Sequence, residues 1–233
     1  MSSSAPEPRA GHALVTGACS GIGAAIAARL LEIGWRVTGI DRMPGSIQSA
    51  AYAHIVTDLA DAQATHRIAG ALTDVDALVH AAGHMRVAPL GSLDPADGEA
   101  MWRIHVRAPE ILLNSIAGQL PDGARVVLIG SRVAMGAAGR SQYAAVKSAL
   151  IGMARSWAAE LAPRAITVNV VAPAATDTPM LHESGRASSA PKLPPIGRFV
   201  SPREVAGLVA FLLGPDGGAI TGQQLVICGG ASL

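Results

Sequence analysis

Aromatic residues and cysteines are scarce in this chain of 233 residues. Only 3% of the residues are Phe, Trp or Tyr while 50% are hydrophobic, so the core must consist mainly of Ala, Val, Leu and Ile. Small aliphatic side chains favour close packing of helices on a sheet. The two cysteines, Cys19 and Cys228, are too few for a secreted disulfide scaffold and fit a reducing compartment. We therefore expect a cytoplasmic protein.

Strong net charge and long apolar runs are also missing. Eighteen basic and 17 acidic side chains give a formal net charge of +1, too little to attract nucleic acid or an anionic membrane. The longest uncharged apolar runs, 165–175 and 205–213, are shorter than the ~18 residues that a membrane span needs. The first nine residues are polar and contain proline, without the apolar stretch of a signal peptide. Residues 1–9 are therefore predicted to form a disordered tail.

Short β-branched runs alternate with longer helical stretches along residues 10–233. The predicted strands cover residues 12–16, 36–40, 54–57, 77–81, 125–130, 166–171 and 224–228. The predicted helices cover 23–33, 61–72, 95–120 (bent at Pro109), 141–161 and 202–213. Strands that alternate with helices imply right-handed crossovers and a doubly wound parallel α/β sheet. With no linker in between, we expect one catalytic domain whose ligands bind at the carboxyl ends of the strands.

The first predicted strand runs into a glycine-rich turn, TGACSGIG, which opens a helix. Gly17 permits the tight turn, Gly21 lets the backbone approach a pyrophosphate, and Gly23 allows the helix to pack closely on the strand. The helix N-terminus adds free N–H groups and a partial positive charge. An ordinary strand–helix turn is the alternative, but the position after the first strand favours a dinucleotide site. The other cofactor-binding candidates in this turn are Cys19, Ser20 and Ile22.

Asp41 ends the second predicted strand, 18 residues beyond the last glycine of the turn. An acidic residue there accepts hydrogen bonds from the adenosine ribose and repels a 2′-phosphate, whereas Arg42 could tolerate one. No Arg or Lys stands between the first two glycines of the turn, so NAD is favoured over NADP. Asp58 and Leu59 follow the third strand, where they either meet the adenine edge or only precede the next helix.

Tyr143 and Lys147 are four residues apart and therefore share one face of a predicted helix. A lysine cation close to a phenol stabilises the phenolate and lowers the tyrosine pKa from near 10, which suits a general acid/base. A chance match to this spacing is expected in about 2% of chains with two tyrosines and two lysines. An amphipathic helix with one surface lysine is the alternative. Ser131 ends the fifth strand, where its hydroxyl could hold a substrate oxygen or only a loop amide.

The ordered motifs resemble the short-chain dehydrogenase/reductase family in its short single-domain form, particularly members like 3-oxoacyl-acyl-carrier-protein reductase. The resemblance extends from about residue 12 to residue 230 and includes NVVAP at 169–173. It implies a Rossmann-type sheet of seven strands in the order 3-2-1-4-5-6-7, with helices on both faces. It also implies NAD(H)-dependent hydride transfer with an alcohol or carbonyl substrate, and a homotetramer or homodimer built partly on the helices that carry Trp102 and Tyr143.

The resemblance assigns roles to particular residues. Tyr143 would donate and accept the proton, Lys147 would bind the nicotinamide ribose and lower the pKa of Tyr143, and Ser131 would orient the substrate. Further implied cofactor contacts are Ala81, Ala82 and Gly83 in the sequence HAAG, where NNAG is usual, with Pro173, Thr176 and Thr178. No metal site is predicted.

His105 departs from the family pattern, since an asparagine that supports a water in the proton relay usually stands there. The imidazole either replaces that asparagine in part or only packs within its helix. A chain that kept its NAD site but lost turnover, as a sensor or scaffold, is therefore the alternative function.

Basic residues in the loops after the strands suggest how a substrate is recognised. His84, Arg86 and Arg132 could receive a carboxylate or a sugar acid, or could be solvated surface charges. Residues 181–195 are predicted to form a mobile lid.

Overall fold

One parallel sheet of seven strands organises the described residues, 11–182 and 191–233, of the computed structural model. Its order is β3-β2-β1-β4-β5-β6-β7, as expected from the resemblance. The strands are β1 His12–Thr16, β2 Arg36–Asp41, β3 Tyr52–Val56, β4 Ala77–His80, β5 Arg125–Ile129, β6 Thr167–Pro173 and β7 Gln224–Ile227. Each differs from its predicted range by at most two residues at either end. The predicted tail and residues 183–190 of the predicted lid lie outside the described residues.

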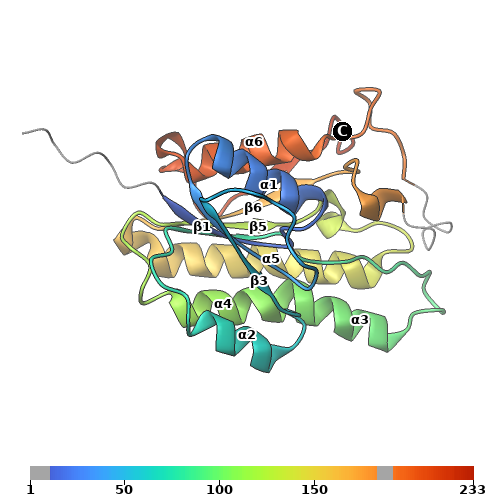
Figure 1. Cartoon of the computed structure of the whole chain (residues 1–233). Coiled ribbons are helices and arrows are strands. Elements are labelled where there is room, and N and C mark those ends of the chain that lie inside the picture. Colours follow the sequence, from blue (N-terminus) through green and yellow to red (C-terminus); the bar gives the residue numbers. More distant parts are fainter. Residues whose placement is uncertain (1–10, 183–190) are drawn as a thin grey trace, which may run out of the picture.

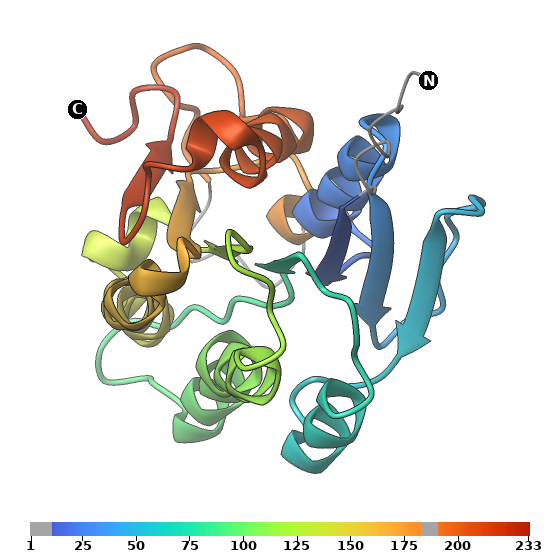
Figure 2. The same cartoon turned by 90° about the vertical axis from the view of Figure 1, so that its left-hand side faces the viewer.

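Helices cover both faces of the sheet (Figures 1 and 2). Helices α1 (Gly21–Glu32) and α6 (Pro202–Leu213) lie together on one face. Helices α2 (Ala62–Ala69), α4 (Ala108–Ile116) and α5 (Ser141–Leu161) lie on the other, with α3 (Pro95–Trp102) leading into α4. The Rossmann-type, doubly wound architecture is therefore confirmed.

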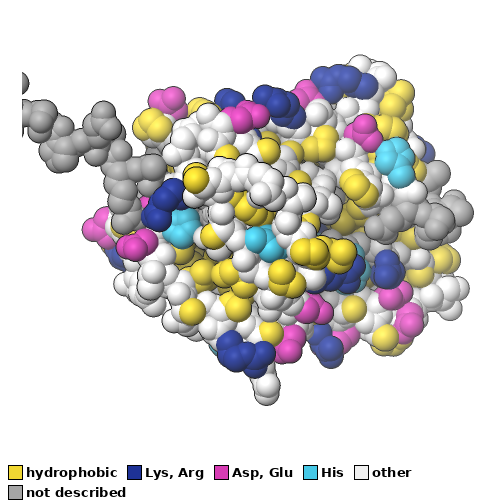
Figure 3. Space-filling view, viewed as in Figure 1, with side chains coloured by type: hydrophobic (Ala, Val, Ile, Leu, Met, Phe, Trp, Pro, Cys, Tyr) yellow, Lys and Arg dark blue, Asp and Glu magenta, His cyan; other side chains and the backbone are white. Residues whose placement is uncertain are grey.

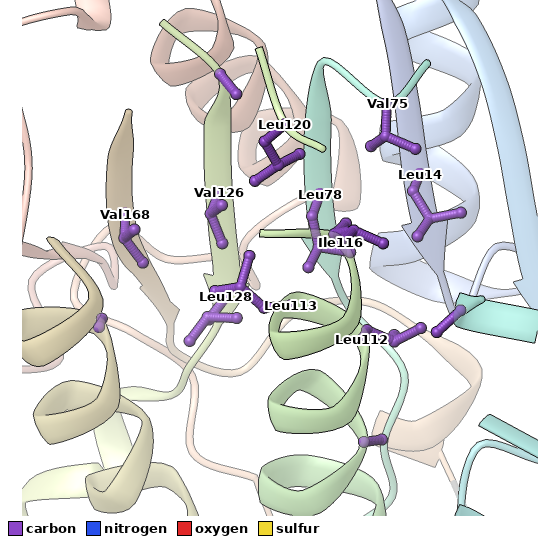
Figure 4. Packing of buried hydrophobic residues seen from close by; sticks show 14 of the residues in the cluster. Leu14, Val75, Leu78, Leu112, Leu113, Ile116, Leu120, Val126, Leu128 and Val168 are labelled. Carbon is purple, nitrogen blue, oxygen red and sulfur yellow. The ribbon is translucent and has the colours of Figure 1, made fainter. Parts of the chain in front are cut away.

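Successive residues of the central strands point into two separate cores. Leu78 of β4 and Leu128 of β5 pack with α4 residues such as Leu112 on one face (Figure 4). Their strand neighbours Val79 and Val127 pack against α1 and α6 on the other face. Each fully buried aliphatic side chain of this size contributes roughly 1.5–3 kcal/mol. Because both faces of the central strands are buried, most of their side chains are apolar, which explains why their ranges could be predicted from the sequence.

The helix starts follow local capping signals. Ser201 precedes α6, and its hydroxyl accepts a hydrogen bond from the Arg203 amide at 3.2 Å. The Glu204 carboxylate accepts one from the Ser201 amide at 2.8 Å, which completes a capping box, with Pro202 in the first turn. Asp61 caps α2 in the same way through the amides of residues 63 and 64.

The long helix predicted over residues 95–120 is interrupted. Between α3 and α4, residues Arg103–Arg107 form a π-helical segment, and α4 ends at Ile116. Pro109 has no N–H to donate to the carbonyl of His105, four residues earlier, and its ring crowds that carbonyl, so a regular α-helix cannot pass through this point. The widened turn places His105 in the interior of the protein.

Charges of both signs are interspersed on the surface, as the face in Figure 3 shows. Exposed ion pairs such as Arg29–Glu32 and Arg203–Glu32, both at 3.2 Å, are typical. Within residues 11–182 and 191–233, no helix is long and apolar enough to cross a membrane.

Candidate active site

The glycine-rich turn connects β1 to α1 in a conformation that needs glycine. Gly17 and Gly21 have positive φ angles of 70° and 52°. A Cβ on Gly23 would lie 2.1 Å from the Gly17 carbonyl oxygen. Ser20 stands at the N-cap of α1 without a side-chain capping bond, and the first turn holds no acidic residue. The first amides of α1 therefore remain available for an anion, which fits the pyrophosphate of a dinucleotide.

The Asp41 carboxylate is fixed beside this turn. It accepts hydrogen bonds from the amides of Cys19 and Met43, both at 3.1 Å. Burial raises the pKa of the Cys19 thiol, and the nearby Asp41 charge raises it further. Cys19 therefore stays protonated at neutral pH. Arg42, the neighbour that could tolerate a 2′-phosphate, is exposed.

Two aromatic side chains hold the loop that follows Asp41. Tyr52 donates a hydrogen bond to His54 Nδ1 at 2.9 Å, and His54 Nε2 donates one to the Met43 carbonyl at 2.9 Å. The Tyr52 hydroxyl also lies over Gly39, where a Cβ would be 2.1 Å away. These contacts were not predicted, because they join residues whose neighbourhood depends on strand pairing.

The two residues predicted to meet the adenine differ in burial. Asp58 is exposed and accepts a hydrogen bond from the Ala60 amide at 2.9 Å. The Leu59 side chain is only 4% exposed and packs in the core. Only the backbone of Leu59 is therefore left for contact with a base.

Thr16 joins the ends of β1 and β4. Its hydroxyl accepts hydrogen bonds from the amides of Ala81 and Ala82 at 3.0 and 3.1 Å and donates to Nδ1 of His80 at 2.9 Å. His80 Nε2 donates to the carbonyl of Ile104 at 2.9 Å. Burial and the Lys147 charge lower the pKa of His80 to about 3, so this imidazole is neutral. The HAAG motif was predicted from the sequence, whereas its attachment to Thr16 was not.

A cavity of about 900 Å³ opens at the carboxyl edge of the sheet. Ten of the predicted site residues line it: Ile22, Ala81, Gly83, His105, Ser131, Tyr143, Lys147, Pro173, Thr176 and Thr178. The other predicted residues do not line it and lie at or just beyond the ends of β1 to β4: Gly17, Cys19, Ser20, Gly21, Gly23, Asp41, Arg42, Asp58, Leu59 and Ala82. The predicted catalytic residues thus share one cavity, and the predicted ribose-binding carboxylate lies outside it.

Lys147 and Tyr143 approach each other inside this cavity. The Lys147 ammonium lies 5.7 Å from the centre of the Tyr143 ring and donates a hydrogen bond to the Ile129 carbonyl at 2.6 Å. The Lys147 side chain is buried, and burial lowers its pKa from 10.5 to about 7. A cation held this close to a phenol favours the phenolate.

Ser131 is oriented by the turn that it begins. Residues Arg132–Met135 form the 3₁₀ helix η2, and the Ser131 hydroxyl oxygen accepts a hydrogen bond from the Val133 amide at 3.1 Å. That bond uses the oxygen as an acceptor and leaves the hydroxyl proton to be donated into the cavity.

His105 is buried, with one ring nitrogen bonded and one not. Nε2 donates a hydrogen bond to the His84 carbonyl at 2.7 Å, so the neutral ring carries its proton there and Nδ1 is an acceptor. Nδ1 has no hydrogen-bond partner among the described residues. The ring stands edge-on to Tyr143 with centroids 5.7 Å apart. Burial lowers the pKa of His105 well below its usual range, and the Lys147 charge lowers it further, so the imidazole is neutral.

Among residues 11–182 and 191–233, no three His, Cys, Asp or Glu side chains are grouped so that they could hold a metal ion.

Comparison with known proteins shows which family the chain resembles over most of its length. The model of a family described as enoyl-(acyl carrier protein) reductase matches residues 17–232. The chain is 37% identical over 236 residues to the 3-oxoacyl-acyl-carrier-protein reductase FabG of Vibrio harveyi, covering 94% of this chain and 96% of that protein. It is 30% identical over 240 residues to D-threitol dehydrogenase of Mycolicibacterium smegmatis, covering 95% and 92%.

Solved structures show the same relationship. A blue fluorescent protein from a metagenomic library, solved in complex with NADPH, superposes with a TM-score of 0.84 at 33% identity. That alignment covers 96% of this chain and 98% of the other. The similarity therefore includes nearly the whole chain.

Proposed function

Because this chain belongs to the short-chain dehydrogenase/reductase family, we propose that it is an NAD(H)-dependent alcohol dehydrogenase or ketoreductase. One observation carries the proposal: Ser131, Tyr143 and the buried Lys147 all line one cavity beside the glycine-rich turn. The relatives named above are a reductase and a dehydrogenase, which supports the same reaction class. On this proposal, residues 10–233 work as one catalytic domain.

The proton chemistry follows from these side chains. A bound nicotinamide supplies or accepts the hydride. During reduction, the Ser131 hydroxyl donates a hydrogen bond to the substrate oxygen, and Tyr143 delivers a proton to that oxygen. During oxidation, Tyr143 removes the proton from the alcohol. The Lys147 cation, 5.7 Å from the centre of the Tyr143 ring, stabilises the phenolate that remains after proton delivery, and its Nζ would bind the nicotinamide ribose.

His105 serves this proton transfer as a neutral acceptor. Its Nδ1 is buried without a hydrogen-bond partner among the described residues, next to Tyr143 and close enough to Lys147 for the lysine charge to lower the pKa of the imidazole. An acceptor that stays neutral can bind a donor such as water without competing for the proton. His105→Asn should therefore retain turnover better than His105→Leu, which removes the acceptor, when kcat is measured against pH.

Asp41 supports a preference for NAD(H) over NADP(H). Its carboxylate is fixed by two amides at the end of β2, where it can accept ribose hydroxyls and repel a 2′-phosphate. The NADPH in the similar blue fluorescent protein shows that this fold also admits the phosphorylated cofactor. The Asp41 charge would therefore have to produce the preference of this chain for NAD(H).

The remaining contacts to the cofactor would lie along the carboxyl edge of the sheet. The glycine-rich turn would hold the pyrophosphate, and the ends of β3 and β4 would hold the adenosine and the nicotinamide ribose. Pro173, Thr176 and Thr178 line the cavity where the carboxamide would bind.

Two measurements test the proposal. The first is a fluorescence titration of the protein with NADH and with NADPH, in which tight NADH and weak NADPH binding is expected. The second is turnover of a panel of carbonyl substrates by the wild type and Tyr143→Phe. The variant should bind NADH normally and lose about 10²–10⁴-fold in kcat, because general acid–base catalysis typically contributes that much. Failure to bind either cofactor would refute the oxidoreductase proposal.

We also propose a homotetramer or homodimer that works in the cytoplasm. Trp102 at the end of α3 is 40% exposed and Phe211 of α6 is 44% exposed, which suits helices that pack against another subunit. Both cysteines are free thiols, as a reducing compartment allows. Sedimentation of the wild type and Trp102→Arg tests the assembly, since the variant should form smaller particles.

A further inference from the structure

Among the described residues, those that line the active-site cavity include basic side chains but no acidic ones. Its described lining includes four basic side chains, Arg132, Arg140, Lys147 and Lys192, and no Asp or Glu. The whole chain has nearly equal numbers, 18 basic and 17 acidic residues. The local imbalance is therefore a property of this cavity and not of the overall composition.

Arg132 is the best-placed of these cations. It directly follows Ser131 in the chain, and both residues line the cavity. Its backbone is fixed in η2, where the Ala134 amide bonds the Ser131 carbonyl at 3.0 Å and the Ser148 hydroxyl bonds the Ala134 carbonyl. Arg132 is half-buried and forms no ion pair with the described residues.

The other two residues that the sequence suggested for an acidic group, His84 and Arg86, do not line the cavity. Arg86 lies 3.7 Å from the Asp97 carboxylate and does not line the cavity. The His84 side chain also lies outside the lining, and its carbonyl accepts the bond from His105. Of the three residues predicted to receive an acidic group, only Arg132 reaches the cavity.

Apolar side chains cover much of the remaining wall. Met85, Val133, Met180, Leu181 and Leu193 line the cavity together with several prolines. The cavity thus offers an apolar surface, a hydroxyl and a phenol for the reacting oxygen, and a guanidinium one residue away from that hydroxyl.

We infer that the substrate carries an anionic group, a carboxylate or a phosphate, which Arg132 binds while Ser131 and Tyr143 hold the reacting oxygen. The inference rests on the proposed function and adds the substrate class. A guanidinium binds either anion through two parallel hydrogen bonds, which a neutral ester or amide cannot accept with the same strength. Lys192, from the segment after the undescribed residues, is another of the four basic residues that line this cavity.

The test compares charged and neutral members of matched substrate pairs. One pair is 4-oxohexanoate and its methyl ester, which probes a carboxylate on the carbon skeleton. The other is 3-oxobutanoyl-coenzyme A and the neutral N-acetylcysteamine thioester of the same acyl group, which probes a phosphate on a carrier arm. Each is assayed with the wild type, Arg132→Gln, Arg132→Lys and the control Arg86→Gln.

We expect the wild type to prefer the charged member of one pair by about 10-fold or more in kcat/KM, since hydrogen bonds to charged groups are the strong ones. Arg132→Gln should lose that preference through KM, Arg132→Lys should keep part of it, and Arg86→Gln should keep all of it. The responding pair identifies the anion. Equal kcat/KM within both pairs, or a preference that survives Arg132→Gln, would overturn the inference.

A binding experiment separates this inference from the proposed function. Tyr143→Phe loaded with NADH is titrated calorimetrically with 4-oxohexanoate and with coenzyme A, in backgrounds with Arg132 and with Gln at that position. Binding of either anion that depends on Arg132 supports the inference even if no carbonyl substrate is turned over. Absence of binding, or binding unaffected by the Arg132 substitution, counts against it.

Discussion

Gly83 lies directly against the imidazole of His105, so closely that a Cβ on Gly83 would sit 2.0 Å from Cε1 of the ring. The missing side chain is what allows His105 to occupy the interior beside Tyr143. The loop after β4 and the π-helical segment therefore pack directly against each other, so a substitution at either Gly83 or His105 alters the same contact.

Gly83→Ala should displace His105 and break its 2.7 Å bond to the His84 carbonyl. Overpacking of this kind costs about 1–3 kcal/mol in the free energy of unfolding, and turnover should fall with it. Urea unfolding and kcat measure the two effects. Gly207→Ala is the control, because nothing lies within 4 Å of a Cβ at this helical position and stability should rise by about 0.5–1 kcal/mol. Unchanged stability in Gly83→Ala would show that the contact is not tight.

Lys147 should make the stability of the cofactor-free protein depend on pH. The pKa is about 7 when folded and 10.5 in the reference state, so the unfolded chain binds more protons between these values. The contribution of Lys147 to the free energy of unfolding is therefore most favourable above pH 10.5 and becomes less favourable as pH falls towards 7, by up to about 1.4 kcal/mol per pH unit. The measurement is the difference between the wild type and Lys147→Met across this range. Parallel curves for the two proteins would contradict the burial of a titrating lysine.

Asp41→Asn should shift the cofactor preference. The amide keeps the shape of the side chain but loses the charge that repels a 2′-phosphate, so the NADH/NADPH affinity ratio should fall by about 10-fold or more. Fluorescence titration with both cofactors measures the ratio. Asp216→Asn changes net charge equally on an exposed turn and serves as the control. If both variants behave alike, Asp41 does not read the ribose.

Thr16→Val should destabilise the protein by about 3 kcal/mol, because two amides and the His80 ring each lose a buried hydrogen-bond partner worth roughly 1 kcal/mol. Thr16→Ser keeps the hydroxyl and should retain most of the stability. Thermal unfolding of both variants checks the prediction. A valine variant as stable as the serine variant would mean that water replaces the hydroxyl.

Local sequence patterns were sufficient for the strands and for the start of α6, where Ser201, Pro202 and Glu204 act within one turn. The order of the strands came from the family resemblance, since no periodic pattern specifies which strands pair. The π-helical segment around His105 was not predicted, because its cause, Pro109, was interpreted as a bend in a continuous helix.

The site was predictable where a residue type carries the function by itself, as for the glycines, Tyr143 and Lys147. It was not predictable where function depends on position in the fold. Arg86 and Arg132 are equivalent in a sequence, but one pairs with Asp97 and the other lines the cavity. The burial of Leu59 and the hydrogen bond between His54 and the Met43 carbonyl likewise depend on which segments the fold brings together.

The Thr16 hydroxyl makes three hydrogen bonds: it donates one to His80 and accepts two from the amides of Ala81 and Ala82. All three partners lie more than sixty residues away in the chain. These hydrogen bonds therefore join the turn that would hold the pyrophosphate to the wall that would face the nicotinamide. Substitutions in the two segments should show epistasis, with double-mutant effects that differ from the sum of the single ones. A natural or engineered substitution that alters one end of the cofactor site should therefore also alter the effect of substitutions at the other end.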